Sequence, residues 1–334
     1  MQLNVIGDPE STNIQKTEVD KDAMGGTELM KYALAKKVDP AILDKFQIIP
    51  SRYRGTEKGK IPIYWLHDLP GDPESEHLKN QGWKKFEKIV AVSHWQRQQY
   101  QNVYGIPGSK IHVLQNAIEP IDLGDTEEKP DPAECINLIY HTTPHRGLEL
   151  LLPIMDFIQK NLPDVKWHLD VYSSFDIYGP TWSKRNEQYQ PLFDHIEKHP
   201  NMTYHGFKPN EEVKEALKKA HIFCLPSIWT ETSCIAMIEA MSAGCLCVHS
   251  SLGALPETTA NWSLMYDFSE DQNEHATRCA FMLADAMQLI NDPSIDDRLS
   301  MQKAYIDGFY NWDVRAAQWT GFLNNILKEK GIES

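Results

Sequence analysis

Short runs of apolar, mostly β-branched residues alternate along this chain with longer stretches whose apolar residues recur at helical spacing. The short runs are typical of buried strands, and the longer stretches of helices that pack on one face. In the first third, helices are predicted after Gly25-Gly26 and over 94–103, and strands near 2–7, 46–50, 61–66, 88–93 and 111–115. This alternation indicates a parallel α/β architecture.

The alternation is interrupted once, by a segment with almost nothing to bury. Residues 120–134, PIDLGDTEEKPDPAE, are rich in Pro, Asp and Glu, and they predict a linker or domain boundary. Beyond it the pattern resumes, with strands near 136–140, 166–171, 202–205, 221–225 and 245–249, and a helical final third. Two doubly wound sheets facing each other would bind a ligand in the cleft between them, at the carboxyl ends of their strands.

Length, composition and charge narrow the class of protein. The 334 residues are enough for two cores, and 41% are hydrophobic and 24% charged. A transmembrane helix is excluded because no run of about 18 apolar residues occurs. The N-terminal MQLNVIGDPE lacks the basic and apolar regions of a secretory signal, so a cytoplasmic location is expected. A net charge of −14 argues against nucleic-acid binding.

Cysteines and basic residues suggest no chemistry by themselves. None of the six cysteines forms a C-x-x-C pair, and their apolar surroundings favour core thiols over zinc ligands or disulfides. The stretches SRYRGTEKGK and GWKKFEKIV are locally basic. Solvated surface is the plainer interpretation of both, and peripheral contact with anionic lipid or an acidic acceptor is the alternative.

The stretch ETSCIAMIEAMSAG, residues 231–244, opens with one glutamate and contains another at 239, although Glu is rarely fully buried without a partner. HIFCLP before it predicts a buried strand. A helix ending at Gly244 follows, with Thr232 or Ser233 as its N-cap. Glu231 therefore precedes a helix N-terminus, where free N–H groups favour phosphate, and Glu239 lies two turns further on.

That spacing suits a phosphate flanked by two sets of hydroxyl groups, as in a nucleotide sugar. Glu239 could accept hydrogen bonds from vicinal hydroxyls. Spacing alone leaves a plainer alternative open, in which Glu231 only complements the helix dipole and Glu239 forms an ion pair at the edge of the core.

The wider stretch PSIWTETSCIAMIEAMSAGCLCVHSSLGALPE resembles the donor-site signature of retaining glycosyltransferases with the GT-B fold, specifically glycosyltransferase family 4. The matching residues are Pro226, Ser227, Glu231, Glu239, Ala240, Met241, Gly244, Gly253, Pro256 and Glu257. Where the family usually has G-F-G, this chain has Thr232-Ser233-Cys234. The resemblance implies that backbone N–H groups of these three residues bind the donor.

A second resemblance lies at INLIYHTTPHRGLELLLPIM, where Arg146-Gly147 stands in place of the family's basic residue and glycine. It implies that the Arg146 guanidinium neutralises a diphosphate by bidentate hydrogen bonds. The family's more upstream arginine is absent, and HTT at 141–143 stands in its place. The resemblance implies either weaker donor binding or a shift of this contact to hydroxyl groups, with Thr142 as the candidate, and to a histidine. The alternative for Arg146 is a surface arginine that caps its own loop.

Three weaker resemblances complete the expected site. NMTYHGFKPNEEVKEAL is similar to the turn that contacts the nucleobase, with Gly206, Phe207 and Lys208 as candidates. MGGTELMKYALAKKV is similar to the family's glycine-rich loop, where Gly25 and Gly26 would let backbone approach the diphosphate or the reacting carbon. IPIYWLHDLP ends in His67, the place of a cleft histidine near the donor sugar. A plain turn and a structural histidine are the alternatives.

The resemblance implies the following roles. Glu231, His67 and Arg146 are the catalytic candidates, and Glu239 holds the ribose. The donor-binding candidates are Gly25, Gly26, Thr142, Arg146, Gly206, Phe207, Thr232, Ser233, Cys234 and Glu239. No D-x-D ends a strand, so neither a metal nor a cofactor is expected.

We therefore expect an α/β protein of GT-B architecture. Its expected parts are a Rossmann-like acceptor domain, a Rossmann-like donor domain and a C-terminal helix that returns to the first domain, over 1–120, 135–310 and 311–334. The expected function is metal-independent, retaining transfer from a nucleotide-diphosphate sugar, a UDP- or GDP-sugar, to a glycan, lipid-linked or small-molecule acceptor. A sugar-nucleotide epimerase is one alternative. A nucleotide-sugar-binding pseudoenzyme or assembly partner is the other, because the upstream arginine and the G-F-G are missing.

Overall fold

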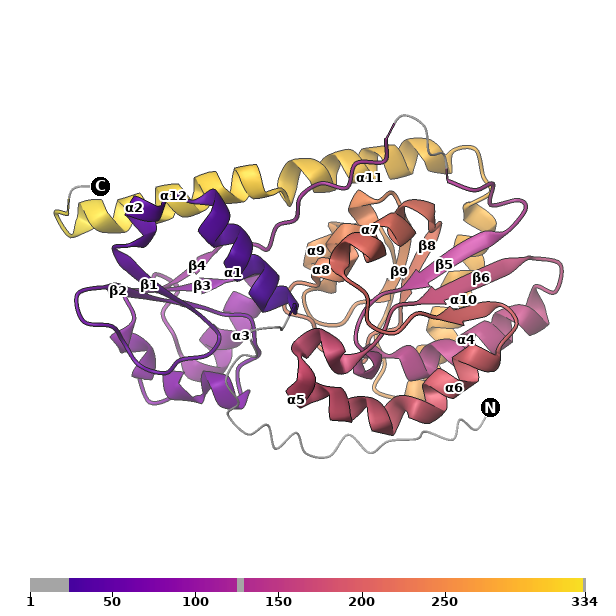
Figure 1. Ribbon diagram of the computed structural model, residues 1–334, viewed down its shortest axis with the longest axis horizontal. Coiled ribbons are helices and arrows are strands. Elements are labelled where there is room, and N and C mark those ends of the chain that lie inside the picture. Colours follow the sequence, from indigo (N-terminus) through magenta and orange to yellow (C-terminus); the bar gives the residue numbers. More distant parts are fainter. Residues whose placement is uncertain (1–23, 125–128, 333–334) are drawn as a thin grey trace. The chain divides into compact units, whose positions relative to one another are not determined.

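The computed structural model describes residues 24–124 and 129–332, which form two compact units. The first unit comprises residues 24–119 and 308–332, and the second comprises the described residues from 120 to 307. Each unit contains one parallel sheet with helices around it (Figure 1). The α/β class predicted from the alternation is confirmed, whereas the strand predicted near 2–7 lies outside the described residues.

The sheet of the first unit has the order β1-β2-β3-β4, and all of its neighbouring strands are parallel. Its strands are β1 (Phe46–Pro50), β2 (Ile61–Trp65), β3 (Lys88–Ala91) and β4 (Ile111–Val113). Its helical elements before residue 119 are α1 (Gly26–Lys37), α2 (Pro40–Leu43), η1 (Pro73–Leu78), η2 (Gly82–Lys85) and α3 (His94–Tyr104). All four strands and both longer helices occur where the sequence predicts them.

The last helix of the chain, α12 (Trp312–Glu329), completes the core of the first unit. Trp319 of α12 lies edge-on to Trp65 of β2, with ring centroids 4.9 Å apart, and Phe322 stacks on His112 of β4 at 4.7 Å. The Asn311 side chain caps the helix by accepting a hydrogen bond of 2.8 Å from the backbone N–H of Val314. The apolar face of α12 is therefore buried against the sheet.

The second unit has a six-stranded parallel sheet of order β10-β9-β8-β5-β6-β7. Its strands are β5 (Ile136–Tyr140), β6 (Trp167–Val171), β7 (Met202–Tyr204), β8 (Ile222–Leu225), β9 (Leu246–Ser250) and β10 (Leu264–Tyr266). From β5 the chain builds outward through β6 to β7, then crosses back to β8 on the other side of β5. Such a reversal is a topological switch point, and ligands of open α/β sheets bind at the carboxyl ends of the strands there.

Helices connect the strands of the second unit. They are η3 (Pro144–Arg146), α4 (Leu148–Asn161), η4 (Phe175–Tyr178), α5 (Pro180–Ser183), η5 (Lys184–Tyr189), α6 (Gln190–Lys198), α7 (Asn210–Lys219), α8 (Ile235–Ser242), α9 (Leu255–Thr259), α10 (Gln272–Leu289) and α11 (Ile295–Phe309). None of the helices in the described ranges combines the length and hydropathy needed to cross a bilayer.

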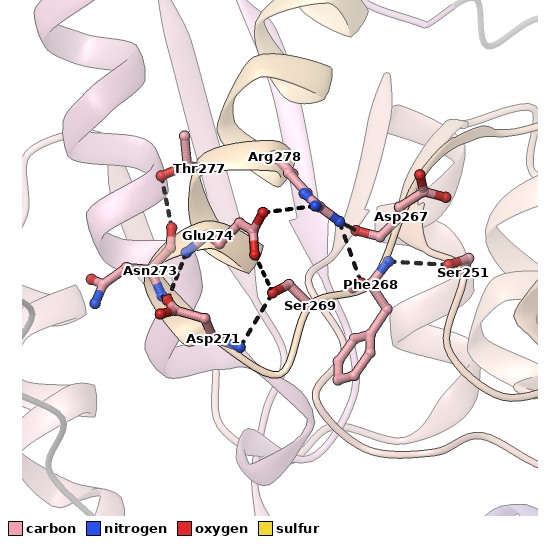
Figure 2. A network of polar contacts seen from close by, with 9 residues as sticks. All are labelled: Ser251, Asp267, Phe268, Ser269, Asp271, Asn273, Glu274, Thr277 and Arg278. Atoms are coloured by element: carbon pink, nitrogen blue, oxygen red, sulfur yellow. Dashed lines mark hydrogen bonds and ion pairs between the residues drawn. The ribbon is translucent and has the colours of Figure 1, made fainter.

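Figure 2 shows how one of these helices starts. The Asp271 side chain caps α10 by accepting hydrogen bonds from the backbone N–H groups of Asn273 and Glu274, at 2.9 and 3.0 Å. Arg278, two turns into the helix, pairs with Glu274 at 2.7 Å and donates to the Asp267 carbonyl at 2.9 Å. The polar groups in this turn therefore serve to fix the connection from β10 to α10.

The cysteines behave as the sequence predicts. All six are free thiols, and all except Cys135 are buried. Cys224 of β8 and Cys279 of α10 lie with their sulfur atoms 3.7 Å apart inside the second unit. These side chains contribute to packing in the core.

Candidate functional site

The two residues with the strongest sequence signal meet at the switch point. Arg146 belongs to η3, which follows β5, and Glu231 lies in the loop that follows β8. Arg146 Nη1 donates a hydrogen bond to Glu231 Oε1, and its Nε donates to Thr143 Oγ1 at 3.1 Å. The Glu231 side chain is only 6% exposed, and that of Arg146 is 21% exposed. The strand order thus brings a carboxylate and a guanidinium together from distant parts of the chain.

The pair is compensated electrostatically. Burial by itself lowers the pKa of Arg146. The adjacent Glu231 carboxylate raises that pKa by more than burial lowers it, so the pKa lies above its usual value. A buried carboxylate without a partner would be costly, and Arg146 supplies that partner. Arg146 also donates to Thr143 of its own loop. One side chain thus makes both the loop contact of the plainer alternative and the contact with Glu231.

Two glycines allow the backbone around this pair to pack closely. Gly147 has φ +111°, and a Cβ there would lie 2.0 Å from the Pro226 carbonyl oxygen. Gly253 has φ +65°, and its Cβ would lie 2.6 Å from the Glu231 carbonyl oxygen. That carbonyl accepts a hydrogen bond of 2.8 Å from the N–H of Ala254. Residues 253–254 therefore fix the backbone of Glu231, which explains why a glycine suits position 253.

Glu239 lies inside α8 and is 6% exposed. One of its oxygens accepts a hydrogen bond of 2.9 Å from Asn210 Nδ2, at the start of α7. Burial raises the pKa of Glu239, and the Asn210 hydrogen bond partly offsets that rise. The alternative of an ion pair is therefore wrong in detail, because the direct partner is an amide. The sequence analysis did not identify Asn210. Its position at the start of the helix after the Gly206 turn was its only distinguishing feature in the sequence.

The start of α8 differs from the prediction. Neither Thr232 nor Ser233 is the N-cap: the helix begins at Ile235, and Cys234 is the N-cap, with φ 74° and no side-chain hydrogen bond. The Ser233 carbonyl accepts a hydrogen bond from Thr258 Oγ1, and the Glu231 backbone is held by Ala254, so the chain enters the helix later than expected. Burial raises the pKa of the Cys234 thiol, which therefore stays protonated.

The left-handed conformation at Cys234 explains why a glycine is usual at this position of the signature. Position 234 corresponds to the second glycine of the G-F-G found in the resembling family. A glycine adopts this conformation freely, whereas a residue with a Cβ is strained there by about 1–2 kcal/mol. The chain thus keeps the backbone geometry of a glycine position with a different side chain.

The other predicted donor residues of the second unit lie at neighbouring strand ends. The Thr142 carbonyl, just after β5, accepts a hydrogen bond of 2.7 Å from Ser173 Oγ, just after β6. Gly206 follows β7 with φ +66°, and Phe207 beside it is 39% exposed. His141 precedes Thr142, and burial lowers its pKa to about 3, so its imidazole is neutral.

Three predicted residues belong to the first unit. Gly25 is the N-cap of α1 with φ −67° and ψ 169°, an extended conformation open to any residue, and α1 itself begins at Gly26. His67 follows β2, with its ring 4.7 Å from that of Trp65. Burial lowers the pKa of His67 to about 3, so this imidazole is also neutral.

Next to His67 lies a carboxyl group to which sequence reasoning gave no role. Burial raises the pKa of Asp68 to about 6, and the nearby Asp72 raises it as well. The Asp68 backbone carbonyl accepts hydrogen bonds from Gln96 Nε2 at 2.9 Å and Tyr100 Oη at 3.1 Å. The end of β2 is thus held rigidly by α3.

Other kinds of site find little support in the part of the chain that the structure describes. Within the described ranges, no group of three or more His, Cys, Asp or Glu side chains is arranged to hold a metal ion. A surface pocket of about 420 Å³ opens between α2, β1 and residues 57–60 of the first unit, and none of the predicted site residues lines it. Among the described residues, the strand ends of the second unit therefore remain the candidate site.

Comparison with known sequences identifies the family that this part of the chain matches. The family model of glycosyl transferases group 1 matches residues 127–293, which is half of the chain. A phosphatidylinositol N-acetylglucosaminyltransferase subunit of Arabidopsis thaliana is 25% identical over 174 residues, covering 51% of this chain and 36% of that protein. Its Homo sapiens counterpart is 24% identical over 175 residues, covering 51% and 33%. The match thus spans about a third of the length of these curated relatives.

Solved structures resemble the chain over more of its length. A glycosyltransferase from Rickettsia africae has a TM-score of 0.62 and 14% identity, covering 93% of this chain and 85% of its own. The S. aureus enzyme TarM in complex with UDP has a TM-score of 0.60 and 16% identity, covering 89% and 59%. The pneumococcal O-GlcNAc transferase GtfA with UDP and GlcNAc has a TM-score of 0.62 and 10% identity, covering 90% and 60%. Likeness at these identities shows the fold, and together with the family model it establishes that the chain belongs to the glycosyl transferases group 1 and has the GT-B architecture.

Proposed function

We propose that the protein is a retaining glycosyltransferase of family 4. In this proposal it moves a sugar from a nucleoside diphosphate sugar to a glycan, lipid-linked or small-molecule acceptor. The observation that carries the proposal is the contact of Arg146 with Glu231 at the switch point of the second sheet. A diphosphate and a sugar hydroxyl are the ligands that a guanidinium and a carboxylate would bind side by side.

The leaving group sets the first requirement. A nucleoside diphosphate leaves readily only when its developing negative charge is stabilised. Arg146 offers the five N–H donors of a guanidinium, two of which contact Glu231 and Thr143 here. The N-terminus of α8 adds backbone N–H groups. These groups would supply the positive charge that a metal ion provides in other enzymes, so the proposed reaction needs neither metal nor cofactor.

The two carboxylates take different roles in this scheme. Glu231 would accept hydrogen bonds from hydroxyls of the transferred sugar and stabilise positive charge near the reacting carbon. Glu239, deeper in α8, would accept from the ribose hydroxyls while Asn210 keeps its carboxylate oriented. Retention follows if the donor phosphate takes the acceptor proton on the same face from which it leaves. For the first unit, we propose that His67, Gly25 and Gly26 contact the donor, as the family resemblance implies.

Printed names of similar proteins suggest which donor to test first. TarM and GtfA were solved with UDP, and both curated relatives are named as components of a phosphatidylinositol N-acetylglucosaminyltransferase. We therefore propose a UDP-sugar, with UDP-N-acetylglucosamine as the first candidate and a GDP-sugar as the second. A cytoplasmic location is part of the same proposal.

The decisive experiment is a thermal-shift screen with UDP-, GDP-, ADP- and dTDP-sugars, followed by transfer assays with the donor that binds. A bound donor should raise the melting temperature by mass action. NMR of the product should show the same anomeric configuration as the donor, and EDTA should not reduce the rate. Inversion, or a rate that depends on added metal, contradicts the mechanism. Tight donor binding without transfer to any acceptor would identify a binding protein, and a product formed without an acceptor would identify an epimerase.

A further inference from the structure

An aromatic surface that the donor-site signature does not use lies beside the Arg146–Glu231 pair. It is formed by residues from η3, from the connection between β6 and α6, and from the loop after β8. We call it the aromatic shelf, and its members are His145, Phe175, Tyr178, Trp182 and Trp229.

The rings of the shelf form a row in which each ring contacts the next. His145 stacks on Phe175 with centroids 5.3 Å apart, and Trp229 meets the His145 ring edge-on at 4.9 Å. On the other side, Phe175 lies 6.5 Å from Tyr178, which lies 5.7 Å from Trp182. These separations and angles are those of attractive aromatic pairs, so the five side chains form one surface.

Hydrogen bonds fix the two segments that carry most of these rings. Asn186 accepts from the backbone N–H of Phe175 at 2.8 Å and donates to Ser174 Oγ at 2.9 Å. In the other segment, Ser227 Oγ donates to the Trp229 carbonyl at 2.8 Å. The rings are therefore held in place before any ligand arrives, which lowers the entropy cost of binding.

Burial is graded across the shelf. Phe175 at its base is 2% exposed, whereas Trp229 is 42% exposed. Of the large hydrophobic side chains that are exposed in the described ranges, Trp229 is the sole tryptophan. A cluster that served only to anchor a loop would bury both of its tryptophans, because burial of these large rings yields the most stabilisation. The shelf instead leaves Trp229 exposed to the solvent and Trp182 only partly buried.

The shelf borders the candidate site directly. His145 immediately precedes Arg146 in the chain, and Trp229 stands two residues before Glu231. Arg185 adds a cation at the far end, with its guanidinium carbon 4.4 Å from the centre of the Trp182 ring. A ligand on the shelf would thus have aromatic faces beneath it and hydrogen-bond donors at both ends.

The chemistry of the shelf favours a sugar ring over a nucleobase. The polarised C–H groups on one face of a pyranose are attracted to the electron-rich face of an aromatic ring, and arginine donates to its hydroxyls. A base attached to a ribose held by Glu239 would extend from α8 and α7, because Asn210 of α7 contacts Glu239. The shelf is built from η3, η4, α5 and the loop after β8 instead.

We propose that the aromatic shelf binds a pyranose ring of the acceptor, so that the acceptor is a glycan. This inference rests on the proposed function, because it takes the Arg146–Glu231 pair to be the place of transfer. It makes the second unit a contributor to acceptor recognition, with Trp229 as the main contact.

The test uses the full chain in two separate binding assays. The fluorescently labelled protein, saturated with UDP, is applied to an array of hexose and N-acetylhexosamine oligosaccharides, and the strongest hit is titrated by calorimetry. Trp229→Ala and Tyr178→Ala test the shelf, Trp229→Phe tests rescue by a smaller ring, and Phe281→Ala is the control. Phe281 is 58% exposed on α10 and contacts Phe157 instead of the shelf. UDP binding of every variant is followed by thermal shift.

We expect Trp229→Ala to weaken binding of the oligosaccharide at least tenfold, Trp229→Phe to restore part of it, and Phe281→Ala to change nothing. The thermal shift with UDP should be the same in all variants. Oligosaccharide binding within twofold of wild type in Trp229→Ala would overturn the proposal, as would a wild-type protein that binds UDP but no glycan. Loss of the UDP shift in Trp229→Ala would assign the shelf to the donor and overturn it too. If no nucleotide sugar binds but shelf-dependent glycan binding persists, the proposed function fails and glycan binding by the shelf stands.

Discussion

The guanidinium of Arg146 and the carboxylate of Glu231 form a hydrogen-bonded ion pair across 85 positions of the sequence. The two residues follow β5 and β8, which are neighbours in the sheet although β6 and β7 separate them along the chain. Each residue neutralises the charge of the other. Each also has the chemistry that one part of a nucleotide sugar requires.

The two partners should contribute unequally to stability. Arg146→Ala leaves a nearly buried carboxylate without a counter-ion and should lower the free energy of unfolding by about 3 kcal/mol. Glu231→Ala leaves a guanidinium that is 21% exposed and still bonded to Thr143, so the loss should be about 1 kcal/mol. Urea unfolding measures both. Arg278→Ala, which breaks an exposed pair with Glu274, is the control, and equal losses in the two site variants would contradict the prediction.

The same two variants should separate donor binding from transfer. Arg146→Ala should weaken UDP binding about 10- to 100-fold, because one charge-assisted contact to the diphosphate is lost. Glu231→Ala should keep UDP binding within a few-fold of wild type and lose transfer at least about 100-fold. Calorimetry with UDP and a radiolabelled transfer assay check these outcomes. Transfer at wild-type rates in either variant would show that the site is assigned wrongly.

Gly253 should matter for activity although it has no side chain that could contact a ligand or react. Gly253→Ala places a Cβ 2.6 Å from the Glu231 carbonyl oxygen at a φ of +65°. The strain should cost at least about 2 kcal/mol and displace Glu231, so transfer should fall with stability. Gly321→Ala is the matched control, because its Cβ meets nothing within 4 Å inside α12. That change should stabilise the protein by about 1 kcal/mol. A fully active Gly253→Ala variant would refute the role given to this contact.

Asp68 should make stability depend on pH in a specific direction. Its pKa is raised from 3.8 to about 6 by burial, so the folded state keeps a proton that the unfolded state loses. Stability should therefore fall as the pH rises from about 4 to about 6, and Asp68→Asn should remove that fall, gaining about 2 kcal/mol at pH 7 relative to pH 4. Urea unfolding at the two pH values measures the difference. Asp285→Asn, on the exposed side of α10, is the control, and identical pH profiles in Asp68→Asn and wild type would contradict the prediction.

His67 should act without changing its charge. Burial lowers its pKa to about 3, so the imidazole should stay neutral from pH 8 down to pH 5. Nitrogen-15 NMR of the histidine rings measures this directly. A His67 signal that titrates near pH 6.5 would contradict the burial of this ring, and the loss of one signal in His67→Gln assigns it.

Most of the fold could be predicted from the sequence because each strand is a short apolar run between turn residues. All nine predicted strands that fall in the described ranges occur, with limits within about two residues. The sequence did not predict β10 (Leu264–Tyr266), a three-residue strand in which only Tyr266 is buried. Its position is set by pairing with β9, and a local pattern contains no information about pairing.

In the candidate site, too, the sequence predicted the individual residues but not the contacts between distant segments. The signature around Glu231 and Glu239 identified both carboxylates, but it could not reveal that Arg146 is the partner of one and Asn210 of the other. Those contacts depend on which strands and helices lie side by side. The start of α8 was misplaced for a related reason: contacts of residues 231 and 233 with residues 254 and 258 override the capping preference of Thr232 and Ser233.

The composition of the first unit has a consequence for how the protein is made. Its sheet is formed by residues before 119, but Trp65 and His112 are covered by α12, near the end of the chain. During translation these strands leave the ribosome early and must wait, with apolar surface uncovered, until some two hundred further residues have been synthesised. The described residues of the second unit all lie between 120 and 307, so this part of the chain is complete earlier and can fold in the meantime. Nascent chains stalled before Trp312 should therefore present a folded second unit beside an unfinished first one that chaperones recognise.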